Sequence, residues 1–236
     1  LIFMSKKNKE GFETRAIHAG QKADPTTGAV MMPIYTSSTF EQESPGVHKG
    51  FDYSRSINPT RKAFEECIAS LENGEVGFGF SSGVAAISAC VELLAPGDHV
   101  IAMNDLYGGT VRLFNEIKTL SQGIEVTYVD MTDIQNVLDA KTDKTKMIFV
   151  ETPTNPLLRV VDLSAIADFA KSEGILSVCD NTFASPYVQQ PLSHGIDIVL
   201  HSATKYLDGH SDLIAGALVI GKKDEELIAR MANIVK

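Results

Sequence analysis

From Asn58 onward, short apolar runs alternate with amphipathic stretches, and this alternation limits the folds that the chain can adopt. Asn58-Pro59 is an N-cap followed by proline at the first helical position, and Asn73-Gly74 is a typical helix end. Alternation of this kind indicates a mainly parallel sheet with helices on both faces, so we predict an α/β fold. Beyond the helix that begins at Pro59, the pattern predicts strands over 76–80, 99–103, 124–130, 146–151, 175–180 and 197–200, and helices over 83–94, 110–120, 132–140 and 163–173. A final apolar stretch over 213–220 ends at Gly221 and leads into a last helix.

Residues 5–58 lack this order. They are polar, with Gly, Pro, Ser and Thr throughout and no lasting helical period, and the stretch is too long for an internal loop. We predict that residues 1–58 form an N-terminal arm that packs on something else, such as another subunit. Residues 59–236 then form the main domain. Leu1, Ile2 and Phe3 precede Met4, which we expect to be the natural start.

Composition argues against several classes of partner. The chain has 236 residues, enough for one large α/β domain or two small ones. A net charge of −9 without a Lys/Arg stripe argues against nucleic acid, and no apolar run approaches the roughly 20 residues of a membrane helix. Cys67, Cys90 and Cys179 are odd in number and have apolar neighbours, so we predict core packing in a reducing cytosol rather than disulfides.

Polar side chains follow the predicted strands at the point where each strand ends. Because ligands of such sheets bind beyond the carboxyl ends of the strands, we expect these residues to gather at one edge. They are Ser81-Ser82-Gly83-Val84, residues 104–109, residues 152–156, Asp180-Asn181-Thr182, and Ser202, Thr204 and Lys205.

An anion site is expected at one of these strand ends. Ser81-Ser82-Gly83 opens a predicted helix, whose first N–H groups and dipole favour negative charge, and Ser202 and Thr204 can add hydroxyl donors. A dinucleotide-binding oxidoreductase is the competing interpretation. The glycines from Gly77 onward are spaced GxGxxxG, however, which is one residue too many for the dinucleotide pattern.

Lys205 and Asp180 are the most informative groups at the predicted edge. Desolvating an ammonium is costly, so Lys205 either extends to water or serves as an amine nucleophile that forms a Schiff base with a carbonyl cofactor. Asp180 is either a cap for the residues after it or the partner of a cationic ring nitrogen. Together with the anion site and the ring of Tyr107, these groups match pyridoxal phosphate, which needs phosphate donors, a pyridinium partner, a stacking ring and an amine.

The motifs also stand in an order that resembles a known family. They are Tyr53-Ser54-Arg55-x-x-Asn58-Pro59-Thr60-Arg61, Ser82-Gly83, Tyr107-Gly108-Gly109, Glu151-Thr152-Pro153-x-Asn155-Pro156, Asp180-Asn181-Thr182, and Ser202-Ala203-Thr204-Lys205-Tyr206 through Gly209-His210-Ser211-Asp212. The order is similar to that of the Cys/Met-metabolism family of pyridoxal-phosphate (PLP) enzymes, which includes cystathionine γ-synthase, cystathionine γ- and β-lyases and methionine γ-lyase. The resemblance covers roughly residues 12–230 of the chain. It implies an aspartate-aminotransferase-like fold (fold type I) and a cytoplasmic homotetramer built from tight dimers.

The resemblance also implies a role for each matching residue. Lys205 would bind the cofactor covalently and later move protons, with Asp180 on the pyridinium nitrogen and Tyr107 stacked on the ring and assisting proton transfer. Asn155 would contact the 3′ oxygen of the ring or the substrate carboxylate. The implied phosphate ligands are Ser82, Gly83, Val84, Ser202 and Thr204, together with Tyr53 and Arg55 acting on the neighbouring subunit. The residues His201, Asp208, His210 and Asp212 fit no standard metal-ligand spacing, so we predict no metal site and expect this stretch to support the lysine loop.

The reaction is less constrained than the cofactor. Methionine γ-lyases typically carry cysteine where this chain has Gly109, so the resemblance favours an enzyme of trans-sulfuration that handles cystathionine. A carbon–sulfur lyase is the first hypothesis, and cystathionine γ-synthase acting on O-acylhomoserine and cysteine is the second. A dinucleotide-binding oxidoreductase and a catalytically inactive assembly subunit remain as alternatives of other classes. Family members are longer than this chain, so we expect a C-terminal domain, with the arginine that binds the substrate α-carboxylate, to be missing from it. The chain alone should then bind PLP but hold amino-acid substrates poorly.

Overall fold

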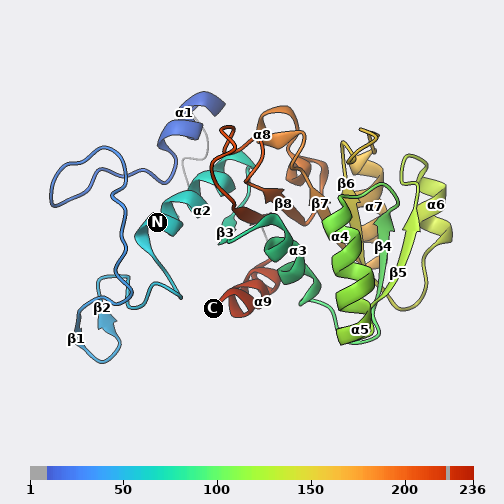
Figure 1. Cartoon of the computed structure of the whole chain (residues 1–236), viewed down its shortest axis with the longest axis horizontal. Coiled ribbons are helices and arrows are strands. Elements are labelled where there is room, and N and C mark those ends of the chain that lie inside the picture. The colour runs from blue at the N-terminus through green and yellow to red at the C-terminus, as the bar shows by residue number, and fades with distance from the viewer. Residues whose placement is uncertain (1–9, 222–223) are drawn as a thin grey trace, which may run out of the picture.

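The computed structural model describes residues 10–221 and 224–236, and within them seven strands form one sheet in the order β3-β9-β8-β7-β6-β4-β5 (Figure 1). Strands β4 to β8 run parallel to their neighbours in this group, whereas β9 lies antiparallel between β3 and β8. The predicted mainly parallel sheet is therefore confirmed. The strand bounds are β3 Val76–Phe80, β4 His99–Met103, β5 Glu125–Val129, β6 Thr145–Glu151, β7 Leu176–Asp180, β8 Ile198–Ser202 and β9 Gly216–Ile220.

The helices largely follow the predicted pattern. Asn58 caps the first long helix, since its side chain accepts the N–H groups of Thr60 and Arg61, and Gly174 ends α7 in the left-handed conformation that glycine adopts without strain. The helix expected over 110–120 is a continuous segment with a π-helical turn at its centre. The bounds are α2 Pro59–Leu71, α3 Gly83–Val91, α4 Gly108–Arg112, the π turn Leu113–Lys118, α5 Thr119–Gln122, α6 Ile134–Asp139, α7 Leu163–Glu173, α8 Ser185–Val188, the 3₁₀ turn Pro191–His194 and α9 Glu225–Val235.

The two faces of the sheet bury different clusters. Ile68 and Ala69 of α2 pack on Ala217 and Val219 of β9, while Leu218, the residue between them, belongs to the large cluster that includes α3. This division follows from the strand period, because successive side chains point to opposite faces. Strand β4 is buried along its whole length, and after His99 it is a continuous apolar run of the kind expected when helices cover both faces.

Strand β8 extends two residues past the predicted end. His201 and Ser202 pair with Ala217 and Gly216 of β9, and β9 begins at Gly216 rather than at residue 213. Polar residues continue the strand here because the antiparallel partner satisfies their backbone groups. A Cβ on Gly216 would lie 2.1 Å from the backbone oxygen of Ser82, so this position admits only glycine.

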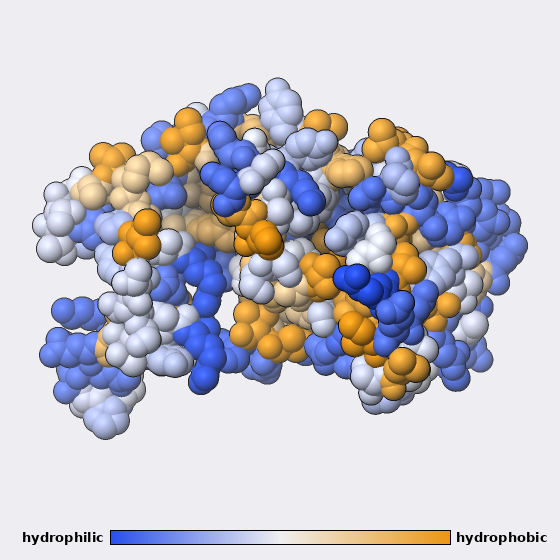
Figure 2. All heavy atoms as spheres, viewed as in Figure 1, coloured by the Kyte–Doolittle hydropathy of each residue, from blue (hydrophilic) through white to orange (hydrophobic). Residues whose placement is uncertain are grey.

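The N-terminal segment is more ordered than predicted. It contains helix α1 (Phe12–His18) and a hairpin of β1 (Gln42–Ser44) and β2 (Val47–His48), whose turn uses Gly46 at a φ of 79°. Helix α1 packs on α2 of its own chain, where the Arg15 guanidinium hydrogen-bonds Ser70 O and Asn73 Oδ1. Such tertiary contacts override the weak local signal. Farther along, Figure 2 shows the arm projecting from the rest of the molecule, mostly hydrophilic with isolated hydrophobic residues. The boundary at residue 58 and the contact with another subunit stay predictions, and the interpretation of Leu1–Met4 lies outside the described residues.

The cysteine prediction holds for two of the three positions. Cys90 and Cys179 are buried in the core, but Cys67 is only partly buried, with Sγ 3.8 Å from the backbone oxygen of Arg15. Cys67 therefore lies on the side of α2 that contacts α1 rather than in the core. None of the helices formed by residues 10–221 and 224–236 combines the length and apolar character that crossing a bilayer requires.

Candidate active site

A cavity of about 280 Å³ lies at the carboxyl ends of β6, β7 and β8, beside the start of α3 and the loop after β4. The parallel strands bring their ends to this one edge, as predicted. Every predicted site residue outside the N-terminal arm lines the cavity: Ser82, Gly83, Val84, Tyr107, Asn155, Asp180, Ser202, Thr204 and Lys205.

The first turn of α3 forms one end of the cavity. The first N–H groups of a helix have no partner inside it, and Ser82 Oγ accepts the N–H of Ala85. Within the described contacts this leaves the N–H groups of Gly83 and Val84 available to an anion, with the helix dipole in their favour. A Cβ at Gly83 would lie 2.8 Å from Ser202 Cβ, so glycine lets the helix start approach β8 closely.

Asp180 is the buried carboxyl group at the end of β7. Its Oδ1 accepts two hydrogen bonds from Thr182, from the backbone N–H at 3.0 Å and from Oγ1 at 2.5 Å. Thr182 Oγ1 in turn accepts the N–H of Ser202 at 2.8 Å, which ties the ends of β7 and β8 together. Burial raises the pKa of Asp180, while the Thr182 donors and the nearby His201 oppose that rise.

Glu151, a second carboxyl group, was not predicted as a site residue. It is the register partner of Asp180 on the adjacent strand, lines the same cavity and is only 6% exposed. Its Oε2 accepts the backbone N–H of Tyr107 at 2.9 Å. Burial, and then the neighbouring Asp180, raise the pKa of Glu151 to about 8. The sequence does indicate this role, because Glu151 is the last residue of a predicted strand and the other site residues also lie at strand ends.

Lys205 and Tyr107 are the exposed members of the site. Lys205 lies in the turn after β8, and among the described residues its Nζ has no ion-pair or hydrogen-bond partner. The environment of Lys205 is solvated rather than desolvated. Its role as an amine nucleophile stays a prediction. The ring of Tyr107 is 46% exposed, and a Cβ at Gly109 would come within 2.3 Å of its Cε1. Glycine at 109 therefore permits the observed position of the ring.

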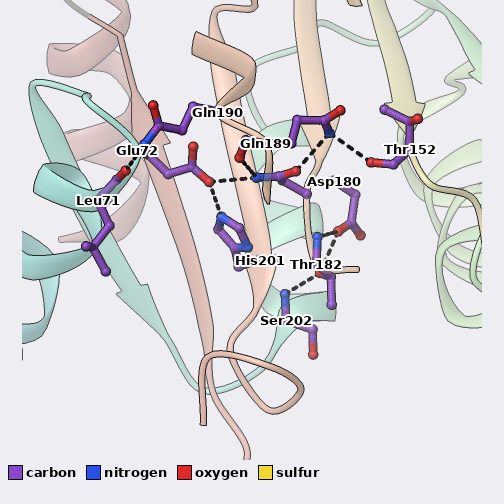
Figure 3. A network of polar contacts seen from close by, with 10 residues as sticks. Leu71, Glu72, Thr152, Asp180, Thr182, Gln189, Gln190, His201 and Ser202 are labelled. Atoms are coloured by element: carbon purple, nitrogen blue, oxygen red, sulfur yellow. Dashed lines mark hydrogen bonds and ion pairs between the residues drawn. The ribbon is translucent and has the colours of Figure 1, made fainter. Parts of the chain in front are cut away.

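A polar network holds the same strand ends from the opposite face of the sheet (Figure 3). His201 Nε2 lies 2.6 Å from Glu72 Oε1, which also accepts a hydrogen bond from Asn181 Nδ2 at 2.8 Å. Gln189 Nε2 donates to Asn181 Oδ1 and to Thr152 O. Glu72 and His201 are completely buried. His201 is thus a structural partner of α2, which agrees with a supporting role for this stretch.

The structure does not bring Tyr53 and Arg55 into the cavity. They lie in the N-terminal arm, with the Arg55 guanidinium 5.1 Å from the centre of the Tyr53 ring. Their predicted contact is with a neighbouring subunit, and it stays a prediction. Across residues 10–221 and 224–236, no three His, Cys, Asp or Glu side chains are grouped so that they could hold a metal ion.

The family model and the similar proteins all indicate the same family for this chain. A family model described as Cys/Met metabolism PLP-dependent enzyme matches residues 13–235. The chain is 58% identical over 213 residues to a cystathionine beta-lyase of Coxiella burnetii, covering 90% of this chain and 55% of that protein. It is 48% identical over 209 residues to a probable cystathionine gamma-synthase of Herpetosiphon aurantiacus, covering 89% and 65%.

A solved structure extends this agreement to the fold. A cystathionine gamma-lyase from Lactobacillus plantarum, complexed with L-serine, matches with a TM-score of 0.92 and 49% identity, covering 96% of this chain and 58% of that one. The chain thus spans between 55% and 65% of the length of these three relatives. By both sequence and fold, this chain belongs to the Cys/Met-metabolism family of PLP-dependent enzymes.

Proposed function

We propose that this chain forms the PLP-binding part of a carbon–sulfur lyase that cleaves cystathionine. The observation that carries the proposal is the arrangement of Lys205, Asp180 and the first turn of α3 around a single cavity. Each of the three supplies a different chemical group, and PLP is a ligand that needs all of them.

The groups that line the cavity match both the hydrogen-bond acceptors and the charged groups of PLP. The N–H groups of Gly83 and Val84 meet the requirement for phosphate donors, and the hydroxyls of Ser202 and Thr204 line the same cavity. Both donors from Thr182 reach Oδ1 of Asp180, so Oδ2 is the oxygen left to meet a ring nitrogen. Lys205 Nζ has no protein partner among the described residues that would compete with a carbonyl ligand.

Each residue of the site would then have a separate role toward the cofactor or the substrate. When bound, PLP supplies a carbonyl that joins to amines and a cationic ring that withdraws electrons from the substrate. Asp180 stabilises the proton on the ring nitrogen through a charge-assisted hydrogen bond. Lys205 Nζ would provide the amine that holds the cofactor, and as a free amine it could accept and return protons on the substrate. Tyr107 packs its ring on the cofactor, and Asn155 contacts its 3′ oxygen or the substrate carboxylate.

The substrates we propose are small sulfur amino acids: cystathionine, cysteine, homocysteine or O-acylhomoserine. The names of the Coxiella and Lactobacillus relatives favour a lyase, and Gly109 favours an enzyme that handles cystathionine. The Herpetosiphon relative favours the alternative of γ-synthase. We further propose a cytoplasmic homotetramer of tight dimers, in which Tyr53 and Arg55 complete the phosphate site of the neighbouring subunit.

Replacement of Lys205 tests the cofactor assignment. The wild-type protein with PLP should show the long-wavelength absorbance of a lysine-bound cofactor, and borohydride should remove it. Lys205→Ala should lack this absorbance because, among the described residues, no other lysine lines the cavity. Lys171→Ala, at an exposed position on α7, is the matched control and should behave as wild type. Unchanged absorbance in Lys205→Ala would show that Lys205 does not bind the cofactor.

Product analysis tests the reaction. The protein is offered cystathionine in one assay and O-succinylhomoserine with cysteine in another. Pyruvate from cystathionine indicates β-elimination, 2-oxobutanoate indicates γ-elimination, and new cystathionine in the second assay indicates the synthase. Because the chain alone is expected to hold amino-acid substrates poorly, the assays use high substrate concentrations and long incubations, and the identity of the product rather than its rate is measured. Absence of all three products under these conditions would contradict the proposed function.

A further inference from the structure

Glu151 and Asp180 are two buried carboxyl groups on adjacent strands, and only Asp180 was expected at the site. They are the last register pair of β6 and β7, so both side chains leave the same face of the sheet. Glu151 is 6% exposed and Asp180 is 7% exposed, and both line the cavity. Two carboxyl groups in this arrangement cannot both ionise cheaply, because each charge is poorly hydrated and repels the other.

The two carboxyl groups have different hydrogen-bond donors. Asp180 receives a hydroxyl and an N–H donor from Thr182, and His201 lies near enough to favour its negative charge. Glu151 receives backbone N–H donors from Tyr107 and Asn155, but burial outweighs them.

Two neighbouring carboxyl groups act on Glu151 in the same direction. Asp180 on β7 and Asp105 in the loop after β4 both raise its pKa, which reaches about 8. Lys205, from the turn after β8, and Tyr107, from the loop after β4, line the same cavity. The raised pKa means that Glu151 holds its proton at neutral pH.

The contact of Glu151 with Tyr107 connects this pair to the rest of the site. Tyr107 N–H donates to Glu151 Oε2 at 2.9 Å, and this bond joins the loop after β4 to the end of β6. We propose that Glu151 is a positioning residue of the site: its carboxyl group fixes the Tyr107 backbone at the edge of the cavity, beside its register partner Asp180, and Asp180 is the group that meets the cofactor ring. This inference rests on the proposed function, because it assigns a role to Glu151 within the PLP site.

Two variants separate the shape of Glu151 from its charge. Glu151→Gln keeps an oxygen that accepts the Tyr107 N–H but cannot ionise, whereas Glu151→Ala removes the acceptor. Glu65→Gln is the matched control. Glu65 is also a largely buried carboxyl group whose Oε1 accepts a backbone N–H, that of Gly79 at 2.9 Å, but it lies outside the cavity.

The first readout is the stability of the cofactor-free protein against pH. The pKa of Glu151 is higher in the folded state, so the folded state holds a proton that the unfolded state releases. Stability from this group is fully present below about pH 4.5 and is lost as pH rises to about 8. The melting temperature of wild type should fall over this range. In Glu151→Gln, a large part of this decrease in melting temperature should disappear. In Glu65→Gln, the decrease that is due to Glu151 should remain.

The second readout is the dissociation constant for PLP, measured by titration at neutral pH. Glu151→Gln should stay within about threefold of wild type, whereas Glu151→Ala should bind about tenfold more weakly, since it loses one hydrogen bond that positions Tyr107. Glu65→Gln should bind as wild type does.

The outcomes distinguish this inference from the proposed function. Suppose that Glu151→Gln and Glu151→Ala lose PLP affinity equally, and that the melting temperature of Glu151→Gln depends on pH as that of wild type does. These results would overturn the positioning role of Glu151 and leave the proposed function standing. Failure of the wild-type protein to bind PLP would overturn the proposed function and this inference together.

Discussion

The ends of β7 and β8 carry two polar regions, one on each face of the sheet, and they are built in opposite ways. On the cavity face, Asp180 has one oxygen engaged by Thr182, and Lys205 has no partner among the described residues. On the reverse face, Glu72, His201 and Asn181 bond to one another and are closed to solvent (Figure 3).

The difference separates groups that meet a ligand from groups that hold the strands. Asp180 is the register partner of Leu200, so it leaves the same face as Leu200 and Ser202, and His201 leaves the other. Polar groups left open on the cavity face reduce stability until a ligand satisfies them. The reverse face fixes the backbone that presents them. We expect changes on the reverse face to act mainly on stability and changes on the cavity face mainly on binding.

The largest expected effect comes from breaking the reverse network. His201→Leu leaves the Glu72 carboxyl group buried without its main partner, which should lower the free energy of unfolding by about 3–5 kcal/mol. Denaturant unfolding of the cofactor-free protein measures it.

A double variant provides the control for this experiment. Glu72 Oε2 and His201 Nδ1 already lack partners within the described structure, so replacing both residues by apolar ones removes the unsatisfied atoms as well as the pair. Glu72→Met with His201→Leu should therefore cost clearly less than His201→Leu alone. A loss below about 1 kcal/mol in the single variant would contradict a supporting role for the pair.

An intermediate effect is expected on the cavity face, with opposite signs for binding and stability. Asp180→Asn can still accept the Thr182 donors through Oδ1, but it removes the charge. PLP affinity should fall about 10- to 100-fold through loss of a charge-assisted hydrogen bond. The cofactor-free protein at pH 8 should become no less stable, because a buried carboxyl group beside Glu151 is gone. Titration and thermal unfolding measure the two effects, and a destabilised Asp180→Asn would place this residue with the structural groups.

The smallest expected effect concerns the ring of Tyr107. Gly109→Ala places a Cβ 2.3 Å from the present position of Tyr107 Cε1, so the ring must move. We expect a loss of PLP affinity of a few fold, on the order of 1 kcal/mol or less. Gly108→Ala is the matched control, because a Cβ there meets nothing within 4 Å. Equal affinities in the two variants would show that the position of the ring matters little for binding.

Much of the site was accessible from the sequence, because it depends on local patterns. Ser82 as a helix cap and the polar strand ends follow from periodicity and the rule for parallel sheets. The family resemblance is confirmed by the family model and by the relatives. Glu151 and the partners of His201 were missed because their roles depend on which strands become neighbours. Helix α1 was missed because contacts with α2, distant in sequence, stabilise this short element.

The sequence by itself determined the alternation of strands and helices, and hence the edge at which Lys205, Asp180 and the start of α3 meet. These features depend on hydrophobic period and capping, which act within a few residues. Only the tertiary structure decided that β9 runs antiparallel, that Glu151 lies in register with Asp180, and that Glu72 reaches His201, 129 residues away in the chain. Strand register and the pairing of distant segments depend on how whole elements pack, and no local pattern encodes that packing.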